Sequence, residues 1–90
     1  MIGNISFTPD GWEDYVSWLG EDKRTLKKIV KLIEDITRNG YTGIGHPEPL
    51  KDNLSGYWSR EIDDKNRLIY QILNDGTVEI IQCRGHYTDK

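Results

Sequence analysis

The chain has 90 residues, with 12 Lys and Arg against 15 Asp and Glu, so its length allows one compact domain, residues 1–90, and excludes a multidomain enzyme with a separate cofactor module. A hydrophobic fraction of 36% and a charged fraction of 30%, with three Trp and five Tyr, indicate a globular chain and exclude a disordered one. A domain of this size buries roughly 60% of its unfolded surface, which leaves little room for a deep ligand cavity.

The net charge of −3 and the pI near 5.3 argue against a domain that binds free nucleic acid through bulk charge. The charges are unevenly spread, because residues 10–22 carry five acids and no base whereas residues 23–31 carry five bases. We interpret this pattern as a solvated helix surface, with a contact to a partner or to ribosomal RNA as the alternative.

No stretch approaches the roughly 20 apolar residues of a transmembrane helix, and the start of the chain lacks the basic and apolar regions of a signal peptide. We therefore expect a cytoplasmic protein. Cys83 is the single cysteine, and with only His46 and His86 to help it cannot supply a zinc-ligand cluster of the usual spacing. We expect no internal disulfide, no structural metal and no cofactor.

The first elements are a short strand over residues 2–7 and a helix that begins at Thr8-Pro9, an N-cap followed by proline. An apolar stripe at i, i+3, i+4 and i+7 continues this helix until Gly20, and its residues are Trp12, Tyr15, Val16 and Leu19. Asp22 can cap a second helix that ends at Asn39-Gly40. Its apolar positions are Leu26, Ile29, Val30, Ile33 and Ile36.

Residues 41–55 contain two Gly and two Pro without a sustained period, which predicts a long loop. Three strands follow at 57–62, 67–73 and 78–84, joined by turns at 63–66 and 74–77. The order of strand, helical hairpin and three-strand meander predicts an α+β fold, with the N-terminal strand and the helices packed on an antiparallel sheet.

Strand alternation predicts which side chains face the helices. Leu68, Tyr70 and Ile72 share one face, which should meet the helices together with Trp58 of the preceding strand. Arg67 then projects from the opposite, open face of the sheet, where its guanidinium can bind an anion. The plainer interpretation is an edge arginine paired with a surface acid.

The last strand is harder to orient. If Ile81 and Cys83 join the core, then Gln82, Arg84 and His86 point to the open face. This assignment leaves Val78 and Ile80 on the polar side, which weakens it. His86 could equally be an ordinary surface residue.

Glu48 lies in the long loop between Pro47 and Pro49, whose fixed φ angles restrict the backbone around it. It could be a turn residue that faces water. If it lies near Arg67 and His86, the three groups form a carboxylate, a cation and an imidazole, as RNA cleavage through the 2′-hydroxyl requires.

Four runs carry a family pattern: Gly-His-Pro-Glu-Pro-Leu-Lys at 45–51, Asn-Leu-Ser-Gly-Tyr-Trp-Ser-Arg at 53–60, Asn-Arg-Leu-Ile-Tyr at 66–70 and Cys-Arg-Gly-His-Tyr at 83–87. Together they resemble the Txe/YoeB family of toxins, within the RelE-like superfamily of type II toxin–antitoxin systems, over nearly the whole chain. The resemblance implies a RelE-like fold and an mRNA endoribonuclease that acts in the ribosomal A site. It also implies inhibition by a YefM-like antitoxin and makes a homodimer plausible.

The resemblance also implies roles for individual residues. Glu48 matches the family's general base, Arg67 its phosphate-stabilising arginine and His86 its general acid. Tyr87 matches the aromatic residue beside the histidine. The basic positions expected to contact RNA are Lys51, Arg60 and Arg84.

The chain departs from the family pattern where Glu61 replaces a second arginine, and Ile44 and His46 replace lysines of the loop. It also extends by residues 88–90 beyond the His-Tyr pair. A non-catalytic toxin of the same fold, similar to the gyrase-inhibiting ParE type, is the alternative function, and a degenerate toxin is a third. ParE-type toxins typically lack the Glu/His pair, so Glu48 with His86 is the feature that discriminates.

Overall fold

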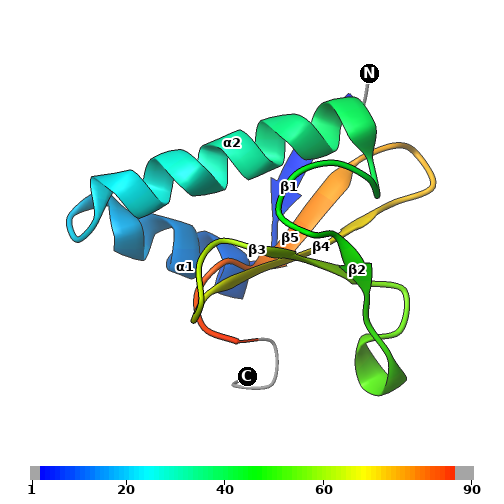
Figure 1. The fold of residues 1–90 in the computed structure, drawn as a ribbon. Coiled ribbons are helices and arrows are strands. Elements are labelled where there is room, and N and C mark those ends of the chain that lie inside the picture. The colour runs from blue at the N-terminus through cyan, green and yellow to red at the C-terminus, as the bar shows by residue number, and fades with distance from the viewer. Residues whose placement is uncertain (1–2, 87–90) are drawn as a thin grey trace.

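The computed structural model describes residues 3–86. Its helices are α1 (Pro9–Leu19) and α2 (Lys23–Asn39), and a 3-10 turn spans Asp52–Leu54. Its strands are β1 (Ile5–Phe7), β2 (Glu48–Pro49), β3 (Trp58–Glu61), β4 (Arg67–Ile72) and β5 (Val78–Gln82). Both helices lie on the same side of the sheet, so the described chain forms two layers, and no helix covers the opposite sheet face, which we call the open face (Figure 1).

The sheet has the strand order β1-β5-β4-β3-β2, and the predicted α+β fold with its C-terminal antiparallel meander is confirmed. Two details differ from the prediction. β1 joins β5 in parallel, so the sheet is mixed and not purely antiparallel. The predicted loop also contributes β2, which adds to β3 at the sheet edge, where Pro49 needs no ladder hydrogen bond on its outer side.

Both predicted N-caps are present. The Thr8 hydroxyl accepts a hydrogen bond from the Gly11 N–H at 3.2 Å, and the Asp22 carboxylate accepts from the N–H groups of Arg24 and Thr25 at 3.1 Å. Each cap satisfies backbone donors that the first helical turn leaves unpaired. The two helices therefore begin where the sequence predicts.

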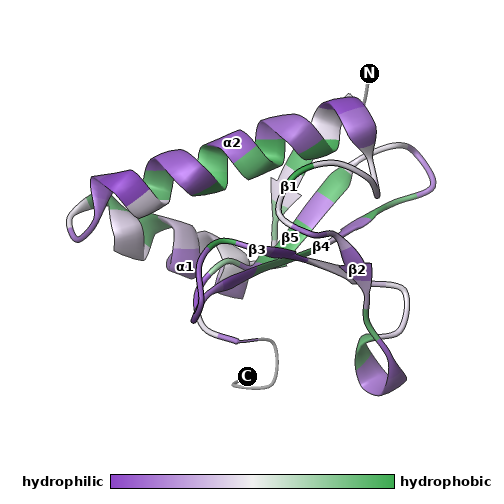
Figure 2. Ribbon diagram, in the orientation of Figure 1, coloured by the Kyte–Doolittle hydropathy of each residue, from purple (hydrophilic) through white to green (hydrophobic). Residues whose placement is uncertain are grey.

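The main core lies between α2 and the centre of the sheet. α2 turns an apolar stripe toward the strands and a charged surface outward, as the green and purple bands of Figure 2 show. The stripe consists of Ile29, Leu32, Ile33 and Ile36. It packs over side chains from β4 and β5, which are Leu68, Tyr70, Val78 and Ile80.

The predicted apolar stripe of α1 is largely exposed, which corrects the sequence-based assignment. Trp12 is 53% exposed and Leu19 52%, whereas the buried face carries Gly11, Asp14 and Trp18. A Cβ at Gly11 would lie 2.4 Å from the Ile80 carbonyl oxygen, so this glycine lets the helix backbone approach β5 closely. Polar contacts to the end of β5, described below, complete this helix–strand interface.

A β-bulge corrects the predicted orientation of the last strand. Ile69 pairs with Gln82 and Tyr70 with Ile80, so Ile81 is the extra residue in β5. The alternation therefore shifts at Ile81. Val78, Ile80 and Cys83 all reach the main core, and Ile81 does not. The predicted orientation was right for Cys83 and wrong for Val78, Ile80 and Ile81.

The aromatic residues of the central strands lie where the sequence predicts. Trp58 pairs with Tyr70 across β3 and β4, and both face the helices. Tyr41, at the start of the long loop, stacks on Trp58 with ring centroids 4.6 Å apart and on Tyr70 at 5.8 Å. The stack anchors the loop to the sheet.

Replacing Trp58 by alanine should lower the free energy of unfolding by about 3 kcal/mol, because it removes a large packed side chain from this stack. The matched control is Trp12→Ala, at a position that is 53% exposed, which should cost under ~1 kcal/mol. Urea denaturation of both variants measures the difference. Equal losses would show that Trp58 does not contribute to the core.

Candidate active site

Glu48 lies on the open face of the sheet, because residues paired across neighbouring strands point to the same side. Glu48 pairs with Ser59, Ser59 with Ile69, and Ile69 with Gln82. These side chains therefore form one row across β2, β3, β4 and β5, opposite the helices. The Glu48 side chain ends this row at the sheet edge and is exposed.

The segment that carries Glu48 has an unusual backbone. His46, with φ 51°, precedes it and Asp52, with φ 57°, follows it, and non-glycine residues seldom adopt this left-handed conformation. Such geometry is common at functional sites. A hollow of about 370 Å³ opens on the segment, and its walls include Glu48, Lys51 and Asp52. Lys51 and Glu48 therefore line the same hollow.

Arg67 begins β4 on the same open face, two residues before Ile69. Its guanidinium donates to the Asp63 carbonyl at 2.6 Å, and its cross-strand neighbour is Glu61. Glu61 is in turn 3.6 Å from the Nδ1 atom of His46. The pair of His46 and Glu61 is exposed and contributes little to stability. Glu61 nevertheless places a carboxylate next to Arg67, the predicted phosphate-binding arginine.

His86 comes to the same end of the sheet as Arg67. The Arg67 N–H donates to the Gly85 carbonyl at 3.0 Å, so the segment after β5 runs beside the start of β4. Figure 1 shows this red segment next to the turn between β3 and β4. Tyr87, the fourth predicted catalytic residue, lies outside the described residues, as do residues 88–90.

The structure thus brings Arg67 and the His86 segment together and places Glu48 farther away on the same face. Glu48 lies on β2 and Arg67 on β4, two strand spacings apart, or roughly 10 Å across the sheet. Ser59 and Ile69, which lie between them on this face, are buried. A carboxylate and a guanidinium on one sheet face supply a base and a cation, which acid–base chemistry on a phosphodiester uses.

Comparison with known proteins identifies the family. A family model described as the YoeB-like toxin of bacterial type II toxin–antitoxin systems matches residues 7–87. A protein of Streptomyces coelicolor named toxin YoeB is 54% identical over 83 residues, which cover 92% of this chain and 98% of the relative. The chain belongs to the YoeB toxin family.

Solved structures agree with this membership. A YoeB/ParE toxin from Agrobacterium tumefaciens superposes with a TM-score of 0.91 at 41% identity, covering 94% of this chain and all of the other. The Staphylococcus aureus YoeB–YefM heterotetramer gives a TM-score of 0.86 at 45% identity, covering 93% and 97% of the two chains. The S. aureus YoeB dimer gives 0.87 at 44%, covering 97% and 100%.

Arg60 of this YoeB family member does not lie where an RNA contact would require. Its side chain is fully buried beneath the sheet, on the helix side. The guanidinium donates to five acceptors: the Asp35 carboxylate, the Tyr70 hydroxyl at 3.1 Å, and the carbonyls of Gly40 at 2.8 Å, Thr42 at 2.7 Å and Ile44 at 3.1 Å. The prediction that Arg60 contacts RNA is therefore not compatible with its place in the fold. Strand alternation was the available sequence signal for this burial, because Arg60 and the exposed Glu61 are consecutive residues of β3 and point to opposite faces.

Arg60 also explains the glycines of the loop. Gly43 has φ 128°, and a Cβ there would lie 1.9 Å from an Asp35 carboxylate oxygen. Gly45 has φ 80°, and its carbonyl accepts a hydrogen bond from the Glu61 N–H at 2.7 Å. The loop therefore folds tightly around the buried ion pair before it enters β2 and reaches Glu48.

The Arg84 side chain packs against α1 and not on the open face, so its predicted orientation is wrong, while its RNA contact stays a prediction. Its guanidinium donates to the Ser17 hydroxyl at 2.8 Å and to both Glu21 carboxylate oxygens at 3.0 and 2.7 Å. It also stacks over the Trp18 ring, 4.3 Å from the centroid. β5 ends at Gln82, so strand alternation does not extend to Arg84.

α1 holds the backbone just before this residue. The Trp18 Nε1–H donates to the Cys83 carbonyl at 3.0 Å, and the Asp14 carboxylate accepts from the Cys83 N–H at 3.1 Å. These contacts satisfy backbone groups at the end of β5. The buried polar face of α1 therefore fixes where the chain leaves the sheet toward His86.

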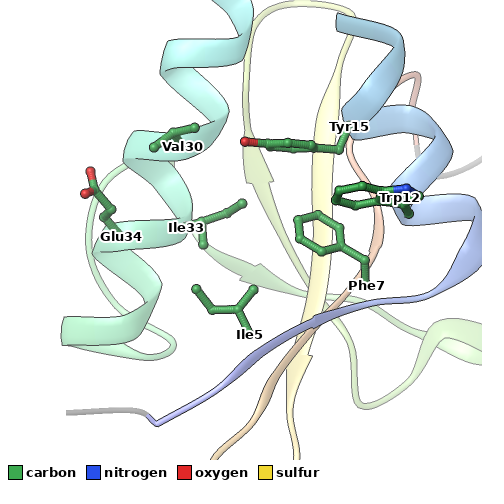
Figure 3. A pocket seen from close by; sticks show the side chains of 7 residues that line it. All are labelled: Ile5, Phe7, Trp12, Tyr15, Val30, Ile33 and Glu34. Carbon is green, nitrogen blue, oxygen red and sulfur yellow. The ribbon is translucent and has the colours of Figure 1, made fainter. Parts of the chain in front are cut away.

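An apolar groove lies on the helix side of the molecule, between β1, α1 and α2 (Figure 3). Its walls are Ile5, Phe7, Trp12, Tyr15, Val30, Ile33 and Glu34, and its volume is about 400 Å³. Glu34 is the one acid in this lining, and no cation accompanies it. The lining therefore lacks the groups that phosphodiester cleavage needs, which leaves the open face as the candidate active site.

Among residues 3–86, neither helix has the length and hydrophobicity that crossing a membrane requires. The same residues bring no three His, Cys, Asp or Glu side chains together as metal ligands.

The stability of this YoeB family member should depend on pH through Asp35. The hydrogen bond from Arg60 lowers the pKa of the Asp35 carboxyl below its ordinary value of 3.8, assisted by the Ile44 N–H. A lowered pKa favours the folded state above about pH 4, and this contribution disappears as the pH falls through the lowered pKa. Asp35→Asn should therefore lower the free energy of unfolding by about 3 kcal/mol at pH 7, since Arg60 stays buried without its carboxylate partner. The free energy of unfolding of this variant should also fall less steeply than that of the wild type as the pH is lowered.

Urea denaturation between pH 7 and pH 2 measures this effect. Asp64→Asn, in the exposed turn between β3 and β4, is the matched control and should keep the wild-type profile. If the free energy of unfolding of Asp35→Asn falls with pH as steeply as that of the wild type, Asp35 is not the group that responds to acid.

Proposed function

We propose that the chain is a ribosome-dependent mRNA endoribonuclease that cleaves the codon in the ribosomal A site and so inhibits translation. The observation that carries this proposal is that Arg67 and the His86 segment meet at one end of the sheet face that also carries Glu48, in a member of the YoeB toxin family. The presence of both Glu48 and His86 favours this function over the non-catalytic ParE-like alternative.

The proposed reaction is an attack of the 2′-hydroxyl oxygen on the adjacent phosphorus. Glu48 takes the 2′ proton while the bond from phosphorus to the 5′ oxygen breaks, and His86 gives a proton to that leaving oxygen. The products are a 2′,3′-cyclic phosphate and a 5′-hydroxyl. Arg67 stabilises the extra negative charge on the phosphorane, and each proton transfer contributes roughly 10²–10⁴-fold to the rate.

The charges of the open face support a requirement for the ribosome. Glu61 lies beside Arg67, the net charge of the chain is −3, and Arg60 and Arg84 are engaged elsewhere. Such a face binds free RNA weakly. A ribosome that already positions the mRNA removes that need and excludes water from the exposed Glu48 carboxylate, which makes it a stronger base.

We further propose that a YefM-like antitoxin inhibits the chain and that two copies associate, as the S. aureus YoeB structures support. The inhibitory segment of the antitoxin would be acidic and initially disordered, and would cover Arg67 and His86. Binding of the antitoxin and of mRNA would then compete. Action on ribosomes also implies a cytoplasmic site of action.

Glu48→Gln and His86→Gln should each lower the single-turnover rate on ribosome-bound mRNA by about 10²-fold or more, because each removes one proton transfer. Ribosome binding should change little, since Glu48 is exposed and the substitutions keep side-chain size. A substrate with a 2′-deoxyribose at the scissile position should bind and remain intact. Cleavage of that substrate would rule out 2′-hydroxyl attack and both assigned roles.

A binding residue provides the contrast. Lys51→Ala should weaken ribosome binding more than it slows the chemical step, because Lys51 contributes charge beside the site. Lys28→Ala, on the exposed surface of α2, is its matched control and should leave both quantities unchanged.

A further inference from the structure

The segment Gly85–His86 has no regular secondary structure, yet several hydrogen bonds hold its backbone. They come from two side chains with no role in the proposed chemistry, Asn66 and Gln82, and from the backbone of Arg67. Because His86 is the proposed general acid, these contacts help to determine the position of that acid.

Asn66 belongs to the turn between β3 and β4. Its Oδ1 accepts a hydrogen bond from the Gly85 N–H at 2.7 Å, while its Nδ2 donates to both carboxylate oxygens of Asp63 at 3.1 Å. Asp63 also accepts from the N–H groups of Lys65 and Asn66 at 2.9 and 2.8 Å. With its donor end bound to Asp63, the Asn66 amide can only present its oxygen to Gly85.

Gln82 approaches from the end of β5. Its side chain is nearly buried, with the residue 5% exposed, and its Nε2 donates to the carbonyls of Gly85 at 3.2 Å and His86 at 3.0 Å. Gly85 adopts a left-handed backbone, with φ 81°, so the chain can turn back over its own strand. The turn therefore satisfies a buried amide and holds the backbone of His86 directly.

The same turn of the chain also holds Arg67. The Arg67 N–H donates to the Gly85 carbonyl, and its guanidinium donates to the carbonyl of Asp63, the residue that orients Asn66. In variants that lose the Asn66 or Gln82 side chain, the Arg67 guanidinium keeps its own acceptor, the Asp63 carbonyl, so these variants disturb Gly85–His86 and leave the arginine held. A shift of about 1 Å in such groups can cost roughly 10²-fold in rate.

We propose that Asn66 and Gln82 are positioning residues, which hold Gly85–His86 so that the His86 imidazole reaches the leaving 5′ oxygen beside Arg67. This inference rests on the proposed function. It predicts that loss of either side chain impairs protonation of the leaving group and leaves substrate binding intact.

Two pairs of variants test the inference. Asn66→Ala removes the acceptor for Gly85, with Asn74→Ala in the exposed turn between β4 and β5 as its control. Gln82→Met removes the donors but keeps an unbranched side chain at this buried position. Its control is Gln71→Met, on the same sheet face. The Gly85 amide should lose at least about 10-fold of its protection from hydrogen exchange in Asn66→Ala and keep it in Asn74→Ala.

The decisive reading uses two ribosome-bound mRNAs, one normal and one with sulfur in place of the scissile 5′ oxygen. A thiolate leaves without being protonated, so this substrate needs no general acid. Asn66→Ala and Gln82→Met should cleave the normal mRNA about 10²-fold more slowly than wild type and the sulfur-containing mRNA within about 3-fold of wild type. Ribosome binding and both control variants should match wild type.

Equal losses on the two substrates would overturn the inference, because they indicate general disruption of the fold. Full Gly85 protection in Asn66→Ala would overturn it as well. If the wild-type chain cleaves neither substrate, the proposed function fails, and the exchange measurement alone then decides whether Asn66 holds Gly85.

Discussion

The buried guanidinium of Arg60 is the interaction on which the placement of Glu48 depends. A charge without access to water is tolerated only when it is paired and hydrogen-bonded, and here α2 supplies the carboxylate of Asp35 while the loop supplies three carbonyls. Burial raises the pKa of Tyr70, so its hydroxyl stays protonated and donates to the Gly40 carbonyl at 3.2 Å. The loop is thereby tied to α2, β3 and β4 before it forms β2.

The proposed site is therefore built from two independent supports. The Arg60 ion pair determines where β2, and with it Glu48, joins the sheet. The hydrogen bonds around Asn66 determine where Arg67 and His86 lie at the start of β4. β3 and β4 connect the two supports, because β4 carries both Tyr70 and Arg67, so the distance between base and acid depends on the sheet itself. A sheet is a rigid element for that purpose, because each strand is held by paired neighbours.

Sequence reasoning located the helices, their caps and the faces of β4, because caps and alternation are local signals. It misplaced the buried face of α1, since Gly11, Asp14 and Trp18 are buried through contacts to the distant backbone of β5 and not through hydrophobicity. It misplaced Val78, Ile80 and Ile81, because a one-residue bulge leaves no clear mark in a strand pattern. It also placed Arg84 on the open face, because it extended the alternation beyond Gln82, where β5 ends.

Arg60 shows that contacts between residues distant in sequence also limit what can be predicted for the site. An arginine in a family motif suggests a nucleic-acid contact, but only the fold reveals that Asp35 lies within reach, 25 positions earlier. Glu48, Arg67 and His86 were accessible from the motif, whereas Asn66 was not singled out. Its role depends on a hydrogen bond to Gly85, which is 19 residues away.

The central claim is that this open face cleaves mRNA that a ribosome presents. Primer extension on a defined mRNA with the purified chain, with and without ribosomes, tests it most directly. The account predicts new 5′ ends at the A-site codon with ribosomes present and few or none on free mRNA. No new ends in either condition would contradict the nuclease, and equal cleavage in both would contradict the requirement for the ribosome.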